Sequence, residues 1–438
     1  MGTPNTVSPL LNGGSPYYLV NKSLRFRSSA SAYMNRTPSV ASNRKTWTWS
    51  GWVKRGTLGV SQTLFSGYVD VNNKTRINFN STDLLQIYDI TGGATERVKV
   101  YTTQVFRDPS AWYHIVVAMD TTQATAANRT IIYINGVAVT SLSSAVYPTQ
   151  NTDLYIDATN THRIGADGDP LYFDGYMAEM NFIDGQALTP SSFGAFDTNG
   201  IWQPIRYSGT YGTNGFYLPF TNTASTTTLG YDYSGNSNNW TTNNISLTAG
   251  TTYDSMVDSP TVSNVASNYS VLNPLLTGGV GTPSSGNLVA SATGATMQSS
   301  FPMQTGKWYA EVTLGSIGSQ DQAIGITSTV NAVGFVPNAG GYGWGVILGR
   351  KWINGAVTTG FTTATANDVV GLAFNADAGQ LDVYKNNVSV FSITGIPTGV
   401  IYNFNNSAGG VAGSDTLNWN FGQRPYVYTC LLYTSDAA

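Results

Sequence analysis

Short hydrophobic stretches separated by turn residues run along the whole chain. Apolar and polar positions alternate in residues 46–54 (TWTWSGWVK), as in a strand with one buried face, with an irregularity expected at Gly51. Residues 112–120 (WYHIVVAMD) are more continuously apolar, as in a strand covered on both faces. Comparable runs lie at 23–26, 76–80, 130–134 and 176–183, and in a second block at 306–314, 322–327, 342–348, 368–375, 381–386, 388–393 and 417–422. The pattern predicts an all-β chain.

Two hairpins are predicted from one repeated pattern. Asn135-Gly136 separates two strand-like runs, and this pair favours a two-residue turn in which both central residues have positive φ. Residues 384–388 (YKNNV) repeat the arrangement of residues 133–137 (YINGV), with Asn in place of Gly. Asn tolerates the left-handed conformation, so the second turn is expected to resemble the first.

The composition of the chain argues against several classes of function. Only 10% of residues are charged, the net charge is −3, and no basic run marks a nucleic-acid surface. No run of 18 apolar residues predicts a membrane-spanning helix, and the first 14 residues do not resemble a secretory signal. The single Cys430 and the two histidines, His114 and His162, argue against an internal disulfide and a zinc centre. Only three acidic residues are Glu, which fits strands better than surface helices.

The first block carries motifs of a known family. They are WYHIVV at 112–117, IYING at 132–136 and FDGYMAEMNFIDGQALTP at 173–190, which contains F-x-G-x-[IM]-x-E before a short strand. With these motifs, residues 20–195 resemble a LamG-like jelly roll of the concanavalin A-like lectin/glucanase class. Residues 1–19 are a lead-in to this domain.

The second block resembles another family of β-sandwiches. GKWYAEV (306–312), DVVGLAF (368–374), LDVYKNN (381–387) and LNWNFGQRPY (417–426) are similar to SPRY motifs. The resemblance places a SPRY-like domain at residues 262–428. The two resemblances together imply two concanavalin A-like jelly-roll β-sandwiches.

Residues 196–261 are predicted to be an irregular connector between the two domains. This segment is rich in Asn, Thr and Gly, but its apolar residues need a packing partner, so we expect it to be ordered. Residues 429–438, which include Cys430, fit neither a strand nor a cap and resemble translated adapter sequence. They are interpreted as a non-native tail.

The connector is similar to segments found between such domains in marine bacteriophage virion proteins, and the whole chain resembles tail or tail-fibre proteins. The resemblance implies a non-catalytic structural and adhesive protein, made in the host cytoplasm and located in the virion. Its expected partners are a host-surface glycan or protein and other virion proteins, with a homo-oligomer as an option. No cofactor is implied.

Two other functions stay open, namely a polysaccharide depolymerase and a module used only in assembly. Retaining glycoside hydrolysis needs two carboxyl groups about 5–5.5 Å apart. Around Glu179 the acids of the glucanase strand motif are absent, and Glu96 and Glu311 have no acid two residues away. Glu179 is therefore predicted to be structural, as a buried acceptor of hydrogen bonds, and Glu311 likewise.

Two groups of residues are candidates for ligand binding. Tyr342 and Trp344 lie among glycines in residues 338–346 and could stack on a sugar, although Trp344 could instead point into the core. Oxygen-bearing side chains with the spacing of the first four ligands of an EF-hand make one turn a calcium candidate, namely Asp232, Ser234, Asn236 and Asn238. The twelfth position is Asn243 instead of Glu, and Asx turns are the alternative explanation.

Overall fold

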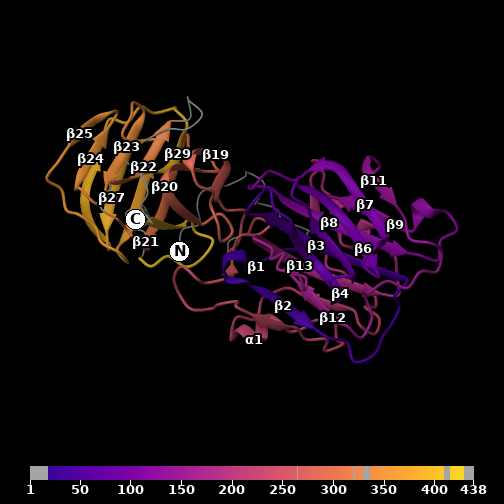
Figure 1. The fold of residues 1–438 in the computed structure, drawn as a ribbon. Coiled ribbons are helices and arrows are strands. Elements are labelled where there is room, and N and C mark those ends of the chain that lie inside the picture. Colours follow the sequence, from indigo (N-terminus) through magenta and orange to yellow (C-terminus); the bar gives the residue numbers. More distant parts are fainter. Residues whose placement is uncertain (1–17, 264, 319–320, 329–335, 409–414, 429–438) are drawn as a thin grey trace. The chain divides into compact units, whose positions relative to one another are not determined.

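Strands form nearly all the regular structure of the chain in the computed structural model (Figure 1). The structure describes residues 18–263, 265–318, 321–328, 336–408 and 415–428. Within these ranges the only α-helix is the four-residue α1 (Thr226–Leu229), which is too short to cross a membrane. Three short 3₁₀ turns are also present: η1 (Ser28–Ala30), η2 (Ala126–Asn128) and η3 (Pro190–Ser192). The predicted all-β fold is confirmed.

The described residues divide into two compact units. Residues 18–248 and Tyr253–Asn268 belong to the first unit, and residues 249–252 and 269–428 belong to the second. Most of residues 196–261, which we expected to be a separate connector, therefore pack within the first unit. Their apolar side chains are the reason, since Tyr217, Phe220, Trp240 and Ile245 are all buried there.

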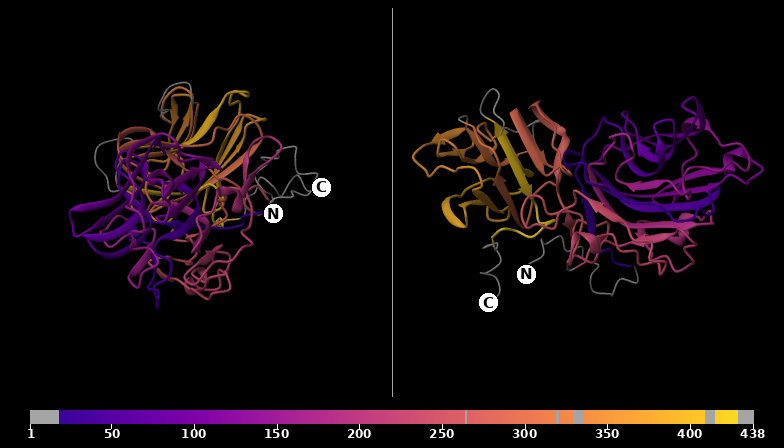
Figure 2. Two further views of the ribbon diagram at one scale, coloured as in Figure 1. Left: turned by 90° about the vertical axis from the view of Figure 1, so that its right-hand side faces the viewer. Right: turned by 60° about the horizontal axis from the view of Figure 1, so that its bottom comes forward.

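The first unit contains two large antiparallel sheets. One has the order β10 (Val137–Ala138), β9 (Thr130–Ile134), β8 (Trp112–Asp120), β3 (Thr46–Arg55), β13 (Gly175–Asp184), β1 (Ser23–Phe26) and β18 (Ser255–Met256), with β16 (Phe216–Leu218) paired to β13. The other has the order β11 (Leu142–Val146), β7 (Thr95–Val105), β6 (Leu84–Thr91), β5 (Asn73–Phe79), β4 (Gln62–Asp70), β12 (Thr161–Ile164), β2 (Tyr33–Arg36) and β17 (Thr241–Asn243). A separate hairpin joins β14 (Gly194–Phe196) and β15 (Trp202–Pro204). Figure 2 shows the two large sheets as stacked layers.

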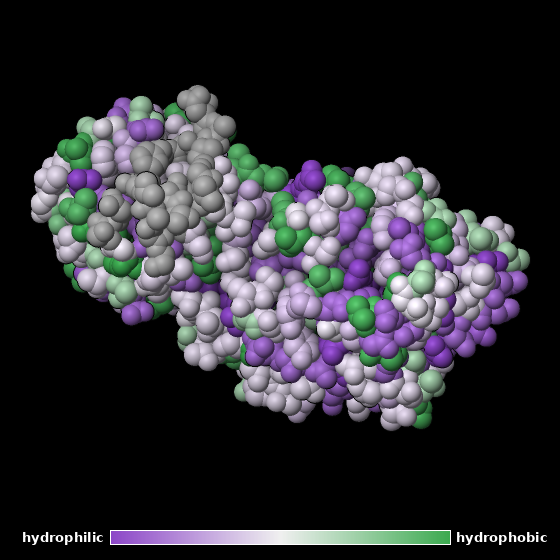
Figure 3. Space-filling model, in the orientation of Figure 1, coloured by the Kyte–Doolittle hydropathy of each residue, from purple (hydrophilic) through white to green (hydrophobic). Residues whose placement is uncertain are grey.

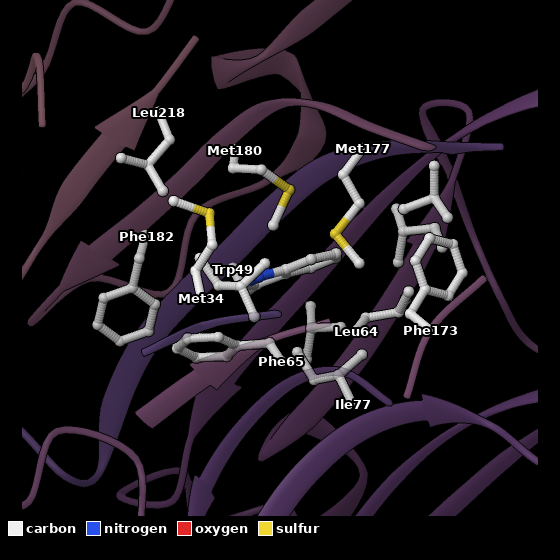
Figure 4. Close-up of a cluster of buried hydrophobic side chains, with 14 of the residues drawn as sticks. Met34, Trp49, Leu64, Phe65, Ile77, Phe173, Met177, Met180, Phe182 and Leu218 are labelled. Carbon is white, nitrogen blue, oxygen red and sulfur yellow. The ribbon is translucent and has the colours of Figure 1, made fainter. Parts of the chain in front are cut away.

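The main core of the first unit lies between these two sheets. Met177 and Met180 of β13 meet Phe65 of β4 and Ile77 of β5, with Trp49 of β3 among them (Figure 4). All five side chains are at most 1% exposed. Residues that alternate with the core positions point to the opposite face of a sheet. This period explains why the strands read as hydrophobic runs broken by polar residues.

A second apolar cluster covers the other face of the first sheet. Val116, Ile183 and Tyr217 project from β8, β13 and β16, and Phe193 and Tyr211 pack against them. Their neighbours along the strands lie in the main core, as the period of two requires. The sheet is therefore buried on both sides, which accounts for the continuously apolar sequence of β8.

The second unit is built on one long path of antiparallel strands. Its order is β25 (Ala356–Thr358), β24 (Arg350–Ile353), β23 (Gly341–Gly345), β22 (Gln322–Ser328), β29 (Tyr402–Ala408), β20 (Val289–Ser299), β30 (Asp415–Asn420), β21 (Lys307–Leu314), β26 (Val369–Asn375), β27 (Gln380–Lys385) and β28 (Val388–Ile393). β19 (Leu272–Val280) pairs with β20, which hydrogen-bonds to β29 through residues 296–298 and to β30 through residues 289–292. β20 thus connects the strands around β29 to those around β30, as a strand does at the corner of a β-sandwich.

Both predicted two-residue hairpins are confirmed. Asn135 and Gly136 have φ of 47° and 83° between β9 and β10, and Asn386 and Asn387 have φ of 48° and 65° between β27 and β28. The irregularity expected at Gly51 lies instead in the neighbouring strand β13, where the register shifts between Ala178 and Asn181. β3 itself stays in register with β8 through Gly51.

Candidate functional site

The structure places Tyr342 and Trp344 in the interior of the second unit. Both lie on β23, where Trp344 is fully buried and Tyr342 is 5% exposed. Tyr342 packs edge-on against Tyr402, with the ring centroids 6.0 Å apart. This corrects the expectation that these two rings stack on a ligand, because the strand continues through the glycines and turns both side chains inward.

The candidate calcium turn is held together by its own hydrogen bonds. The Asp232 carboxylate accepts the backbone N–H of Tyr217 and Ser234 at 2.8 Å each, and that of Asn238 at 2.8 Å. It also accepts the Ser234 hydroxyl at 2.7 Å. Asn236 and Asn238 turn their amide groups toward the backbone carbonyls of residues 212–215. Amide and hydroxyl donors thus already occupy the carboxylate, as expected for Asx turns.

Across the described parts of the chain, no three His, Cys, Asp or Glu side chains are grouped so that they could hold a metal ion. Cys430 lies outside the described residues.

Glu179 is buried at the bulge of β13, with an unusual positive φ of 50°. Its carboxylate accepts hydrogen bonds from Tyr217 Oη at 2.9 and 3.0 Å and from Tyr18 Oη at 3.2 Å. Burial raises the pKa of this carboxyl to about 7, and the two tyrosines oppose the rise. The contacts are those expected of a buried acceptor. Glu311 of the second unit similarly accepts the backbone N–H groups of Val427 and Tyr428.

His114 is held on the outer face of the first sheet. Trp202 donates its indole N–H to His114 Nδ1 at 3.0 Å, so Nε2 carries the proton and donates to Ser50 Oγ at 2.9 Å. Burial lowers the pKa of His114 to about 3. A nucleophile would need this ring as a proton acceptor, but both of its nitrogens already have partners.

A pocket of about 520 Å³ opens at one end of the second sheet of the first unit. We call it the Tyr68–Tyr155 pocket. Its lining residues are Thr37, Arg44, Tyr68, Val69, Tyr155, Ala158, Thr159, Asn160 and Thr161. The lining residues thus include two tyrosines, three threonines, an asparagine and an arginine, and none of them carries a carboxylate. This volume lies within the range of small-molecule sites.

Strand pairing brings the pocket residues together from distant parts of the sequence. Thr161 of β12 lies opposite Tyr68 of β4 in the antiparallel register. The backbone of Tyr155 passes close over β4 at Gly67, where a Cβ atom would overlap the Tyr155 carbonyl oxygen. The Tyr155 hydroxyl bonds to Asn73 at 2.9 Å and to Thr91 at 2.8 Å, which fixes its ring.

His162 shapes the loop that forms one wall of the pocket. Its Nδ1 bonds to the carbonyl of Asn160 at 2.9 Å, and its Nε2 accepts the backbone N–H of Asp157 at 3.0 Å. The ring is therefore neutral, and burial lowers its pKa to about 4. Asn160 Oδ1 is buried and has no hydrogen-bond partner among the described residues, so the wall carries an unused acceptor.

Basic side chains surround the two tyrosines. Arg163 lies 5.4 Å and Lys74 lies 5.6 Å from the Tyr68 ring centroid, and Arg97 lies 4.9 Å from that of Tyr155. Such positions allow cation–π attraction. The Tyr68 hydroxyl donates to Asp169 at 3.2 Å.

Little in the sequence indicates this pocket. Tyr68 and Tyr155 each lie in ordinary strand-like or loop-like surroundings and are far apart in the chain. The available signal was the polar loop of residues 157–162 directly before a strand. Only the pairing of β12 with β4 places that loop beside Tyr68.

Several solved structures are similar to parts of this chain. SPRY domains are among the solved structures that the chain resembles. The SPRY domain of human HERC1 is 10% identical, covers 35% of this chain and 99% of its own, and has a TM-score of 0.32. The TRIM65 PSpry domain is 11% identical over 35% and 89%, with a TM-score of 0.29. A pentraxin from Limulus polyphemus is 16% identical over 39% and 78%, with a TM-score of 0.30.

No curated protein matches the sequence. The family model of the concanavalin A-like lectin/glucanases superfamily, of laminin G type, matches residues 28–193. These residues include both large sheets of the first unit except for β1, β16, β17 and β18. Residues 28–193 of this chain are therefore similar to the concanavalin A-like domains of laminin G type.

Proposed function

We propose that the first unit is a glycan-binding module that holds a sugar in the Tyr68–Tyr155 pocket without cleaving it. The observation that carries the proposal is the make-up of the pocket wall. Tyrosine rings offer apolar faces for the C–H groups of a sugar, and hydroxyl and amide groups bind its hydroxyls. Asn160 supplies an acceptor that has no partner among the described residues.

Binding without cleavage is supported by the acids of the first unit. Glycoside hydrolysis requires two carboxyl groups on either side of the scissile bond. The pocket lining contains neither Asp nor Glu. The nearby Asp169 is already in an ion pair with Lys74.

The molecular surface also favours a pocket over a broad apolar interface. On the face of the molecule in Figure 3, hydrophobic residues are scattered in small groups instead of one continuous patch. Scattered apolar residues are normal on a protein surface and do not mark a docking site.

We place this binding activity in the tail or tail fibre of a bacteriophage virion, with a host-surface glycan as the ligand. The support is the similarity of the connector sequence to segments of virion proteins. Host attachment needs a stable, exposed binding domain, and a β-sandwich buried on both sides of one sheet fits that requirement. Other virion proteins are then further partners.

The direct test is a glycan array followed by calorimetry with the best ligand. Tyr68→Ala and Tyr155→Ala should each weaken binding by about tenfold or more, because a stacking face is lost. Tyr233→Ala is the matched control, since Tyr233 is 43% exposed and does not line the pocket.

Three results would overturn the proposal. Equal affinities of the two pocket variants and the wild type would place the ligand elsewhere. Release of reducing ends from the bound glycan would make the protein a depolymerase. A folded protein that binds no glycan but associates with other tail proteins would be an assembly module.

A further inference from the structure

Two arginines, one in the wall of the Tyr68–Tyr155 pocket and one beside it at Tyr68, form no ion pair with an acid in the described part of the chain. Arg44 lines the pocket and donates only its Nε–H, to the Leu154 carbonyl at 2.7 Å. Arg163 lies over Tyr68, and its Nη1 is buried without a hydrogen-bond partner.

The other basic residues beside the two tyrosines are neutralised by acids. Lys74 forms an ion pair with Asp169, and Arg97 forms one with Asp89 at 2.6 Å. Arg76, on the same strand as Lys74, pairs with Asp167 at 3.0 Å. Each of these three pairs has no net charge, which leaves Arg44 and Arg163 as the cations near the two tyrosines that are in no ion pair among the described residues.

The buried acid next to the pocket does not offset them. Asp157 directly precedes the lining residue Ala158, and burial and the neighbouring Asp184 raise the pKa of Asp157 to about 9. Its carboxyl is therefore protonated and neutral at pH 7. Asp70, which follows the lining residue Val69, is exposed and bonded to Asn72 and Asn73.

We infer that the Tyr68–Tyr155 pocket takes a sugar that carries an anionic group, either a carboxylate or a sulfate, which Arg44 and Arg163 bind. This inference rests on the proposed function. A guanidinium matches a planar or tetrahedral oxyanion with two parallel hydrogen bonds. Tyr68 and Tyr155 then contact the sugar ring, and Asn160 accepts one of its hydroxyls.

The test compares an acidic oligosaccharide with its neutral counterpart. The probes are a galacturonate oligomer, the galactose oligomer of the same length and linkage, and a sulfated galactose oligomer. In low salt at pH 7, at least one acidic probe should bind about tenfold or more tightly than the neutral one. The difference should shrink as NaCl screens the charges. The acidic probe that binds more tightly shows whether the anionic group of the preferred ligand is a carboxylate or a sulfate.

Variants of Arg44 and Arg163 test whether these two residues cause the preference for the acidic probe. Arg44→Gln and Arg163→Gln should each lower affinity for the acidic probe by about fivefold or more, and should lower affinity for the neutral probe by a much smaller factor. Arg163→Lys, which keeps the charge, should retain most of the affinity. Lys99→Gln is the matched control, because it removes one positive charge from a half-buried residue that is not in the pocket. Circular dichroism verifies that each variant is folded.

The outcomes separate this inference from the proposed function. If the neutral probe binds at the tyrosines as tightly as the acidic probes or more tightly, the inference of an anionic ligand is wrong, whereas the proposed glycan site stands. Tight binding of an acidic probe that neither Gln variant weakens would also overturn it. Failure of all probes and of the glycan array to bind would overturn both.

Discussion

Asp157 and Asp184 lie close enough in the interior of the first unit for one carboxyl to donate a hydrogen bond to the other. Asp157 is 1% exposed and has a φ of 63°, and Asp184 is 5% exposed. Asp184 also accepts the backbone N–H groups of Asn43 and Asn214 at 3.2 and 2.9 Å. Burial and the neighbouring Asp184 raise the pKa of Asp157 to about 9, so the Asp157 carboxyl holds a proton at neutral pH.

The Asp157→Asn variant should flatten the dependence of stability on pH. Burial and Asp184 raise the pKa of Asp157 to about 9, against the smaller opposing effect of Arg36. Between about pH 4 and 9 the folded protein keeps this proton while the unfolded chain releases it. The free energy of unfolding therefore falls as pH rises, by up to about 1.4 kcal/mol per pH unit. Asn is neutral and tolerates positive φ, so it removes the slope.

Urea unfolding at pH 5, 7 and 9 checks this prediction. The variant should gain stability relative to the wild type as pH rises. Asp70→Asn, at an exposed residue, should leave the wild-type slope unchanged. An Asp157→Asn profile parallel to that of the wild type would show that Asp157 is ionised in the folded protein.

Tyr217→Phe should destabilise the protein more at high pH than at low pH. The lost hydroxyl donates to Glu179, whose pKa burial raises to about 7. A hydrogen bond to a charged group is worth about 1.5–3 kcal/mol, and one to a neutral group about 0.5–1.5 kcal/mol. The loss measured by urea unfolding should therefore be larger at pH 8.5, where Glu179 is ionised, than at pH 5.5.

Tyr211→Phe is the matched control for this experiment. Its hydroxyl donates at 2.9 Å to the side-chain oxygen of Asn181, which does not titrate. The cost of this change should be the same at both pH values. Equal costs for Tyr217→Phe at the two pH values would contradict the titration assigned to Glu179.

Gly67→Ala should weaken both stability and glycan binding. The new methyl group would overlap the carbonyl oxygen of Tyr155, so the backbone that carries one pocket ring must move. Overpacking of this kind costs about 1–3 kcal/mol. Gly318→Ala is a mild comparison, because its Cβ would meet only Asp415 Oδ1, at 3.2 Å. Calorimetry of a Gly67→Ala protein with wild-type affinity would show that Tyr155 does not hold the ligand.

Trp344→Ala should lower stability without changing glycan affinity. The fully buried indole fills the core of the second unit, and such truncations cost about 3–5 kcal/mol. The Tyr68–Tyr155 pocket lies in the first unit. Calorimetry below the unfolding transition should give the wild-type dissociation constant. A large loss of affinity would show that Trp344 contributes to glycan binding.

Asp232→Ala should destabilise the first unit, whereas calcium should leave the wild type unaffected. The carboxylate holds three backbone N–H groups and one hydroxyl, and loss of such a set costs about 1–3 kcal/mol. Thermal unfolding with calcium and with a chelator should give the same midpoint. An unfolding midpoint that rises when calcium is added would indicate that this turn binds calcium.

Local patterns were sufficient to predict strands and tight turns. Alternation in residues 46–54 and the Asn135-Gly136 pair act over a few residues, and both appear in the structure as β3 and the β9–β10 hairpin. The burial of Glu179 followed from a resemblance in sequence, and its tyrosine partners could not be identified because Tyr18 and Tyr217 are far from it in the chain.

The sequence by itself determined the strand content and the two hairpins, because these depend on residue type and short spacing. Tertiary structure decided which side chains are accessible. It buried Tyr342 and Trp344 on a continuous strand, and it joined Tyr68 to Tyr155 across the β4–β12 pairing. Sheet register decides which side chains are exposed and which distant residues meet. The type of a single residue does not reveal that register.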